Sequence, residues 1–267
     1  MNTAPMTVTP ELKALLRRVK LGRCLDTLTE RLTLAHQQQL THHEFLELLL
    51  ADEVTRRDTS SGELRARTAG LDPAMTLDRW DDTANITYDH HTWNELCSLR
   101  FVDAANNAVI IGPVGVGKTF LATALGHIAV RRRRSVHFER ADTLLKRLKA
   151  SRLDNTHDHE VRKLLRVDLL ILDDFALKAM DPTDTGEIYE IIVERHRRAA
   201  TVVTSNREPA EMLAQMADPL LAQSAIDRLH SAAHELVIEG ESYRKREKPA
   251  STLDDNPAPK PHSKRQH

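Results

Sequence analysis

The most specific spacing of chemically useful residues lies in the stretch "AVIIGPVGVGKTFLATALGHIAV", which begins at Ala108. Gly112, Gly117, Lys118 and Thr119 fit the pattern G-x-x-x-x-G-K-[ST]. A glycine-rich turn aims backbone N–H groups at phosphate oxygens, and the helix after it adds its partly positive N-terminus. Lys118 should reach the β- and γ-phosphates, and the Thr119 hydroxyl should bind Mg²⁺. The predicted nucleotide site consists of Gly112, Pro113, Val114, Gly115, Val116, Gly117, Lys118, Thr119 and Phe120.

Two carboxylates in "VDLLILDDF" could complete a hydrolytic site. Asp173 ends an apolar run, where a carboxylate can hold Mg²⁺ through water. Asp174 follows directly and could orient or deprotonate an attacking water. Acidic residues also end strands for purely structural reasons. Two acids behind four apolar residues, downstream of a phosphate loop, nevertheless favour the catalytic interpretation.

Two further residues are candidates whose roles the spacing leaves open. Asn206, in "TVVTSNREP", could hold the same water if its strand lies beside the strand before the phosphate loop, although Ser-Asn-Arg is also ordinary turn chemistry. Arg228, in "AIDRLHSAAHELVIEGESYR", could be a salt-bridge residue at the edge of the core, or an arginine finger that reaches a neighbouring subunit's γ-phosphate. No N-K-x-D element for guanine occurs, which favours ATP over GTP.

The elements that must position these residues alternate regularly along the chain. Segments typical of strands are Val109–Ile111, Val136–Phe138, Leu169–Leu172, Thr201–Thr204 and Leu236–Ile238. Helical patterns are Thr119–Arg131, Ala141–Lys149, Glu160–Leu165, Gly186–Arg198 and Ala210–Leu229. This alternation predicts an α/β fold with a five-stranded parallel sheet that helices cover on both faces.

Residues 1–74 are predicted to form a small all-helical N-terminal domain. Helical spacing starts at Pro10 and again at about Leu25. A third helix begins near Thr41, where Thr41 and Glu44 have capping-box spacing. The stretch "TSSG", from residue 59, is expected to break this third helix.

Residues 75–245 are assigned to the ATPase domain, and residues 246–267 are predicted to be disordered because they are rich in proline, lysine and polar residues. The formal net charge is -1, so the composition shows no global basic field. Cys24 and Cys97 are expected to be reduced thiols. The N-terminus lacks the apolar core of a signal peptide, and no apolar run approaches the roughly 20 residues of a membrane helix. A cytoplasmic protein without a membrane partner is therefore expected.

A basic stretch from Arg131 to Arg152 is the candidate nucleic-acid surface. It holds nine positive charges against two negative charges in 22 residues. A run of charge is often only a solvated helix face, but this density in a nearly neutral chain favours phosphate contacts. Phe138 is the one aromatic residue within it, so binding should be largely independent of sequence. The predicted DNA contacts are Arg131, Arg132, Arg133, Arg134, Arg140, Lys146, Arg147 and Lys149.

Taken together, these elements resemble the transposition helper ATPases of the IS21 insertion-sequence family, the IstB type, which are relatives of the bacterial helicase loaders DnaC and DnaI. The resemblance covers about Leu12 to Arg244. It rests on "EFLELLLADEVTRR", "GPVGVGKTFLATALG", "LLILDDF", "VERHRRAATVVTSN", "AIDRL" and "GESYR". The phosphate loop and the acidic motif are shared by many ATPases, so the first segment and the last two narrow the family.

The resemblance implies an AAA+ ATPase core without the usual C-terminal helical lid. It implies that the Asn206 strand lies between the phosphate-loop strand and the Asp173 strand, and that Arg228 acts on a neighbouring subunit. It further implies that ATP and Mg²⁺ drive assembly of a ring or spiral on double-stranded DNA. That assembly would recruit or stimulate an IstA-type transposase, and hydrolysis would control its disassembly.

Three residues limit what the resemblance carries over. Asp174 stands where most AAA+ enzymes have glutamate, so slow hydrolysis is expected. Arg195, in "VERHRR", could line a subunit interface or lie on a solvated helix face. Arg244 matches a family signature, and its role stays open.

A helicase loader and a small-molecule kinase are the competing interpretations. DnaI-type loaders carry a zinc site in the N-terminal domain, where this chain has only Cys24. DnaC-type loaders lack the "EFLELLLADE" pattern. A kinase needs an arginine-rich lid near its acceptor, whereas "DDF" and "TSN" suit attack by water better.

Overall fold

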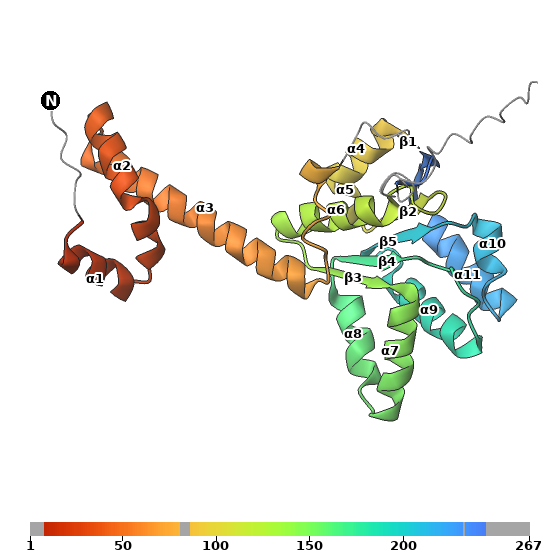
Figure 1. The fold of residues 1–267 in the computed structure, drawn as a ribbon. Helices are drawn as coiled ribbons and strands as arrows, with labels where there is room; N and C mark the ends of the chain where they lie inside the picture. The colour runs from red at the N-terminus through yellow and green to blue at the C-terminus, as the bar shows by residue number, and fades with distance from the viewer. Residues whose placement is uncertain (1–7, 81–85, 232, 244–267) are drawn as a thin grey trace, which may run out of the picture.

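A five-stranded parallel sheet forms the centre of the computed structural model, which describes residues 8–80, 86–231 and 233–243 (Figure 1). The strand order is β3-β4-β5-β2-β6, and each neighbouring pair is parallel. Every residue of β2, β4 and β5 is buried, as expected for central parallel strands. The predicted α/β class and five-stranded sheet are confirmed. The strands are β2 (Asn107–Ile111), β3 (Val136–Arg140), β4 (Leu169–Asp173), β5 (Ala200–Ser205) and β6 (Ala233–Val237).

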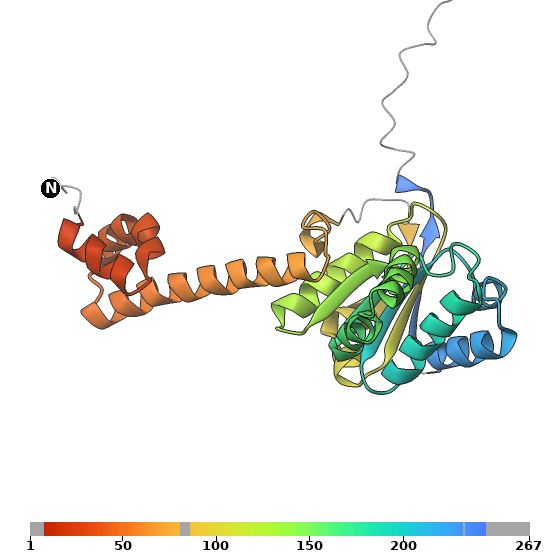
Figure 2. The same ribbon diagram turned by 90° about the horizontal axis from the view of Figure 1, so that it is seen from below.

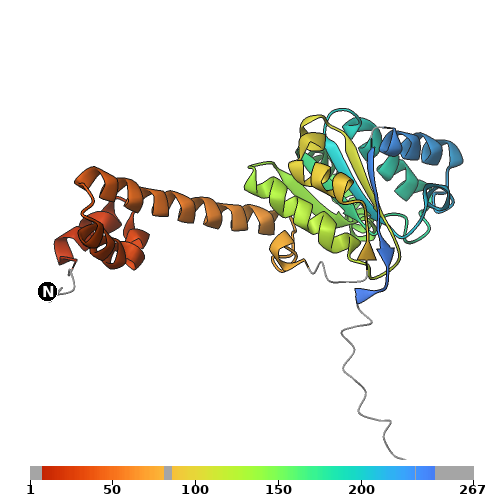
Figure 3. The same ribbon diagram turned by 90° about the horizontal axis from the view of Figure 1, so that it is seen from above.

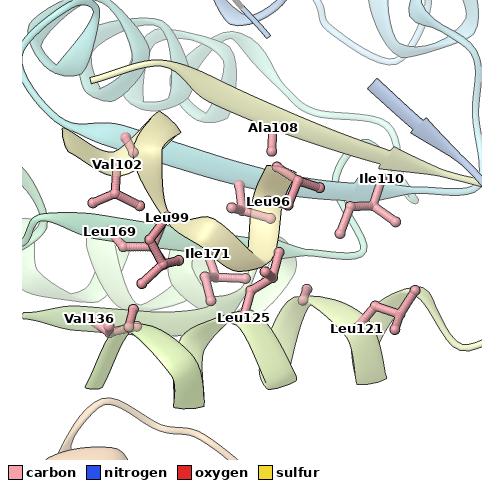
Figure 4. Packing of buried hydrophobic residues seen from close by; sticks show 14 of the residues in the cluster. Leu96, Leu99, Val102, Ala108, Ile110, Leu121, Leu125, Val136, Leu169 and Ile171 are labelled. Atoms are coloured by element: carbon pink, nitrogen blue, oxygen red, sulfur yellow. The ribbon is translucent and has the colours of Figure 1, made fainter. Parts of the chain in front are cut away.

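Helices cover the two faces of this sheet in separate groups. One face packs against α4 (His90–Ser98), α5 (Arg100–Asp103) and α6 (Lys118–Arg131). Figure 4 shows this cluster, in which Leu96, Leu125 and Ile171 meet from α4, α6 and β4. The other face carries α7 (Ala141–Leu153), α8 (His157–Arg166), α9 (Pro182–Arg195), α10 (Pro209–Leu213) and α11 (Pro219–His230).

The last helical stretch differs from the prediction of one helix over Ala210–Leu229. It forms α10 and α11, with a break between them. Asp218 caps α11 through the backbone N–H groups of Leu220 and Leu221, and Pro219 occupies its first turn. Proline lacks an N–H group and suits a helix start, so this pair begins a new helix.

The N-terminal helices are α1 (Pro10–Arg18), α2 (Leu25–Gln38) and α3 (His42–Thr68), with a 3-10 turn at Gly22–Cys24. Cys24, Leu28 and Leu49 form their small buried cluster. The capping box of Thr41 and Glu44 is present. The predicted break at residues 59–62 is wrong, because α3 continues through it. One glycine inside a helix costs only about 1 kcal/mol, which packing of the helix can offset.

The C-terminal end of α3 packs in the core cluster around the sheet. Ala66, Ala69 and Leu71 lie in the core cluster around α6, and the Phe138 N–H donates to the Ala69 carbonyl oxygen at 2.7 Å. Figures 2 and 3 show α1 and α2 held away from the sheet, with α3 joining them to it. The predicted domain boundary between residues 74 and 75 therefore comes after the end of α3, which already packs on the core of the second domain.

Two short strands, β1 (Ile86–Thr87) and β7 (Glu239–Gly240), form an antiparallel pair near the end of the described chain. The predicted disordered tail, residues 246–267, and Arg244 lie outside the described residues. Cys24 and Cys97 are free thiols. Within the described residues, no helix combines the length and the apolar character needed to cross a membrane.

Candidate nucleotide-binding site

The phosphate loop joins the carboxyl end of β2 to the start of α6, as predicted, and two of its glycines are required by geometry. Gly117 precedes α6 with φ +99°, a conformation that L side chains rarely adopt. A Cβ atom at Gly112 would lie 2.3 Å from the Ile238 carbonyl oxygen, because the chain after β6 runs directly beside the loop. A larger residue at Gly112 would push the loop away from Ile238, and one at Gly117 would be strained and would collide with the Trp80 ring.

Lys118 begins α6 and places its amine inside the loop. The side chain is 7% exposed, and Nζ donates to the carbonyl oxygens of Gly112 and Pro113, each at 2.7 Å. Val114 is exposed, whereas the Val116 side chain is fully buried in the core. Val116 can therefore meet a nucleotide only through its backbone.

Thr119 and Asp173 lie together although 54 residues separate them. Thr119 Oγ1 donates to Asp173 Oδ1 at 2.9 Å, and Thr204 Oγ1 donates to the same carboxylate oxygen at 2.6 Å. Burial raises the pKa of Asp173, which is 3% exposed, and the hydrogen bonds from Thr204 and Thr119 oppose that rise. A hydroxyl and a carboxylate in contact are hard oxygen donors, which fit the ligand preference of Mg²⁺.

Asp174 lies in a tight turn directly after β4. Its φ of +53° is in the left-handed region, which Asp and Asn enter more readily than other side chains. Its N–H donates to Thr204 Oγ1 at 3.0 Å, and its Oδ2 lies 3.4 Å from Arg140 Nη2. This backbone gives a physical reason for aspartate at the position: a longer glutamate would have to adopt the same strained φ.

A cavity of about 670 Å³ brings together the predicted catalytic residues other than Arg228. Lys118, Thr119, Asp174 and Asn206 all line it. The structure also places Asn206 as the sheet order requires, since β5 lies between β2 and β4. The other lining residues are Met75, Arg79, Trp80, Val114, Gly115, Gly117, Phe120, Arg140, Leu177 and Tyr243.

Three of the contacting residues were not assigned to this site from the sequence. Thr204 is a buried hydroxyl, and threonine is common in strands, so only its place directly before Ser-Asn hinted at a role. Trp80 packs on Phe120 with ring centroids 5.2 Å apart and covers Gly117. Arg140 was predicted to contact DNA, but it lies at the end of β3, beside Asp174, and lines the nucleotide cavity.

Arg228 lies near the amino-terminal ends of the sheet strands, opposite the end that carries the phosphate loop. Asn107, the first residue of β2, donates from Nδ2 to the carbonyl oxygens of Arg228 at 3.2 Å and Leu229 at 3.1 Å. The phosphate loop begins only after Ile111, at the other end of that strand. Arg228 Nη1 donates to the Ser224 carbonyl oxygen at 2.9 Å. In this position Arg228 does not line the nucleotide cavity of its own chain.

The predicted basic stretch does not form one continuous surface. Arg131 is the last residue of α6, and the three arginines after it follow that helix on one face of the sheet. Lys146, Arg147 and Lys149 belong to α7 on the other face, because β3 runs between the two groups. Arg147 Nη2 lies 2.7 Å from a Glu139 carboxylate oxygen, and Lys149 lies 2.7 Å from Asp181.

Both interpretations of Arg195 are wrong. Its side chain is 1% exposed, so it lies neither at an interface nor on a solvated face. It donates to the carbonyl oxygens of Leu164 at 2.6 Å and Val167 at 3.0 Å, and to Thr201 Oγ1 at 3.1 Å. Its role is to join α8, α9 and β5, and burial lowers its pKa to about 10.

Residues 14–251 match the sequence profile of the IstB-like ATP binding proteins. The chain belongs to this family. It is 35% identical to an insertion-sequence ATP-binding protein of Mycobacterium tuberculosis, over 91% of this chain and 97% of that one. It is 32% identical to an IS21 ATP-binding protein of Pseudomonas aeruginosa, over 93% of this chain and 94% of that one.

Solved structures show the same fold at low sequence identity. The IstB-like chain resembles DnaI with a TM-score of 0.53 and 22% identity, over 61% of this chain and 90% of DnaI. It resembles the replication initiator DnaA bound to AMPPCP and single-stranded DNA with a TM-score of 0.53 and 22% identity, over 64% of this chain and 51% of DnaA. The part of the protein built around the five-stranded sheet therefore has the AAA+ fold, as the resemblance implied.

Proposed function

We propose that the protein hydrolyses ATP and acts, in its ATP-bound form, as a transposition helper that assembles on double-stranded DNA and recruits or stimulates a partner transposase. The observation that carries the hydrolytic part is the contact of Thr119 in the phosphate loop with Asp173, with Asp174 facing the same cavity. Family membership supports the biological part, since the similar proteins belong to insertion sequences.

The chemistry assigns each side chain a separate task. Lys118 offsets the negative charge of the β- and γ-phosphates. Thr119 and Asp173 are the residues that would hold Mg²⁺, which supplies charge neutralisation at the phosphate oxygens. Asp174 and Asn206 hold the attacking water. The water oxygen bonds to the γ-phosphorus while the Asp174 carboxylate accepts a proton from that water, and the bond from the γ-phosphorus to the bridging oxygen breaks. ADP and inorganic phosphate leave, and Asp174 returns the proton to the phosphate or to solvent.

Hydrolysis would end the assembly, and two variants test this. Asp174→Asn suits the left-handed backbone, so ATP and Mg²⁺ should remain bound while hydrolysis slows and the protein stays longer on DNA. Lys118→Ala should lose ATP binding and the ATP-dependent assembly. The measurements are phosphate release and the rate of dissociation from duplex DNA with ATP present.

Equal dissociation rates for wild type and Asp174→Asn would show that hydrolysis does not control release. Unchanged phosphate release by folded Lys118→Ala would refute the ATPase assignment itself. The likeness to DnaI shows the fold alone, so a helicase loader is the second candidate. The DNA-bound assembly, offered an IstA-type transposase and a replicative helicase, should retain the transposase. Retention of the helicase instead would reverse the assignment.

A further inference from the structure

A second cavity of about 670 Å³ lies between α3 and the end of α6, apart from the phosphate loop. Its walls are residues 58–67 of α3, residues 127–133 at the end of α6, and the segment between Leu71 and Arg79. Figure 1 shows α3 reaching the core beside α6. We call this cavity the α3–α6 groove.

The α3–α6 groove is strongly basic. Five arginines line it against two carboxylates, those of Asp58 and Glu63. Asp58 pairs with Arg133 at 3.1 Å, in a contact that is mostly exposed. Arg67 and Arg131 are exposed, and neither forms a salt bridge with a carboxylate of the described residues, although Arg131 lies near enough to Asp78 to help lower the pKa of that carboxyl. The five arginines are Arg65, Arg67, Arg79, Arg131 and Arg133.

The wall that carries these arginines is fixed by the core. Arg65 Nη2 donates to the Val130 carbonyl oxygen at 3.3 Å, and its Nη1 donates to Ser61 Oγ at 2.6 Å. Arg65 Nε is buried and has no hydrogen-bond partner among the described residues. Ala66 packs in the core cluster directly beside it. Arg65, whose guanidinium is already held by these contacts, loses little further conformational freedom when a ligand binds, and the fixed backbone presents Arg67 from a defined position.

The chemistry of the lining selects the ligand. Paired guanidinium groups suit phosphate oxygens, which accept two parallel N–H donors. Among the described residues that line the groove, His127 carries the one aromatic ring; it is 9% exposed and its Nε2 lies 2.8 Å from the Asp72 carbonyl oxygen. A free nucleotide would therefore find little surface on which to stack its base. A backbone of successive phosphates needs only the charges.

We infer that the α3–α6 groove binds the phosphate backbone of double-stranded DNA, an inference that rests on the proposed DNA-binding function. It keeps Arg131 and Arg133 from the predicted basic stretch and adds Arg65 and Arg67 from α3. The α7 cations are not part of it. The sequence did not indicate that Arg67 belongs to a basic surface, because residues 1–75 carry ten basic and ten acidic residues.

The test compares two double variants of equal charge. Arg67→Gln with Arg131→Gln alters the groove, and neither side chain makes an ion pair or hydrogen bond that the fold needs. Arg162→Gln with Arg166→Gln is the control, since both arginines are exposed on α8, over the opposite face of the sheet. Equal urea midpoints for the three proteins establish that folding is unaffected.

Binding is measured by the anisotropy of a labelled duplex, with a non-hydrolysable ATP analogue, over a series of salt concentrations. The groove variant should bind about tenfold more weakly for each arginine lost at about 0.1 M salt, and its slope of log affinity against log salt should fall by about 0.9 per arginine. The control should bind like wild type with an unchanged slope.

The outcomes separate the two claims. Groove and control variants with the same affinity and the same slope would overturn the groove while leaving DNA binding intact. A wild type that binds no duplex in any salt concentration would overturn the proposed function, and the groove with it. If the groove variant bound inorganic phosphate more weakly than wild type but bound the duplex equally well, the groove would be a site for small anions, and the inference would be wrong.

Discussion

Thr204 contacts both of the acidic residues that follow β4. Its hydroxyl donates to Asp173 Oδ1 and accepts the Asp174 N–H, so one side chain fixes the carboxylate that we propose holds Mg²⁺ and the turn that presents Asp174. The two acids could be predicted, because charge behind an apolar run is conspicuous. Thr204 could not, because a hydroxyl in "TVVTSN" is ordinary strand composition until the sheet order places β5 beside β4.

Thr204→Val should therefore separate nucleotide binding from hydrolysis. Valine keeps the shape but removes the hydroxyl, leaving the Asp174 N–H without its acceptor and the Asp173 carboxylate less firmly oriented. We expect hydrolysis to fall about 10- to 100-fold, the usual range for an orienting contact, with little change in ATP affinity. Steady-state phosphate release and equilibrium ATP binding measure the two quantities.

Thr201→Val is the matched control. Thr201 is buried on the same strand, but its hydroxyl accepts from Arg195 at the far end of β5. Its loss should lower the urea midpoint and leave the rate of hydrolysis unchanged. If both variants lost activity in proportion to stability, the special role of Thr204 would have to be abandoned.

The start of α3 can be predicted from the local sequence, but its end cannot. Its start follows from a capping box that can be identified from two residues. Its length does not, because the last turns are held by contacts with α6 and β3, about 65 residues further along the chain. The "TSSG" stretch is a poor helix former alone, and tertiary packing overrides that preference.

A second link between elements joins β3, α7 and α8. Arg147 on α7 pairs with Glu139 on β3 and with Glu160 on α8. Burial alone would raise the pKa of Glu139, but hydrogen bonds from His137 and Arg147 outweigh it and lower that pKa to about 2. The ionised carboxylate therefore stabilises the fold above its ordinary pKa of 4.5, and this contribution is lost as the pH falls toward 2.

Glu139→Gln should remove this pH dependence. Between about pH 6 and about pH 3, wild type should lose about 2 kcal/mol of unfolding free energy that the variant does not lose. Urea unfolding of both proteins at each pH measures the difference, in which titrating groups remote from Glu139 cancel; His137 and Glu160, which share its contacts, do not. A gap between the two proteins that stays constant with pH would contradict the assignment.

At the scale of the whole molecule, the layered α/β architecture could be predicted from the sequence, but contacts between distant segments could not. Alternating strand and helix segments specified the parallel sheet and its two helical layers, since each segment repeats the same simple rule. The α3–α6 groove and the burial of Arg195 could not be predicted, because both arise where residues far apart in the chain meet.

Arg228 can be understood only in the whole molecule, because it lies near the amino-terminal ends of the strands, opposite its own phosphate loop. If it completes a neighbour's site, Arg228→Ala should bind ATP but fail to hydrolyse it. Mixing Arg228→Ala with Lys118→Ala should restore part of the activity, because one interface in the hybrid combines an intact loop with an intact arginine. Phosphate release across mixing ratios measures this. Additive inactivity at every ratio would rule out action between subunits.

The separation of Arg228 from the phosphate loop also has a numerical consequence for such an assembly. In an open head-to-tail row, the subunit at one end has no neighbour to supply its arginine, so a pair of subunits contains a single working site. The share of working sites then rises with the length of the row and reaches unity only when the row closes on itself. Turnover per subunit would thus report how long the protein's rows have grown on DNA.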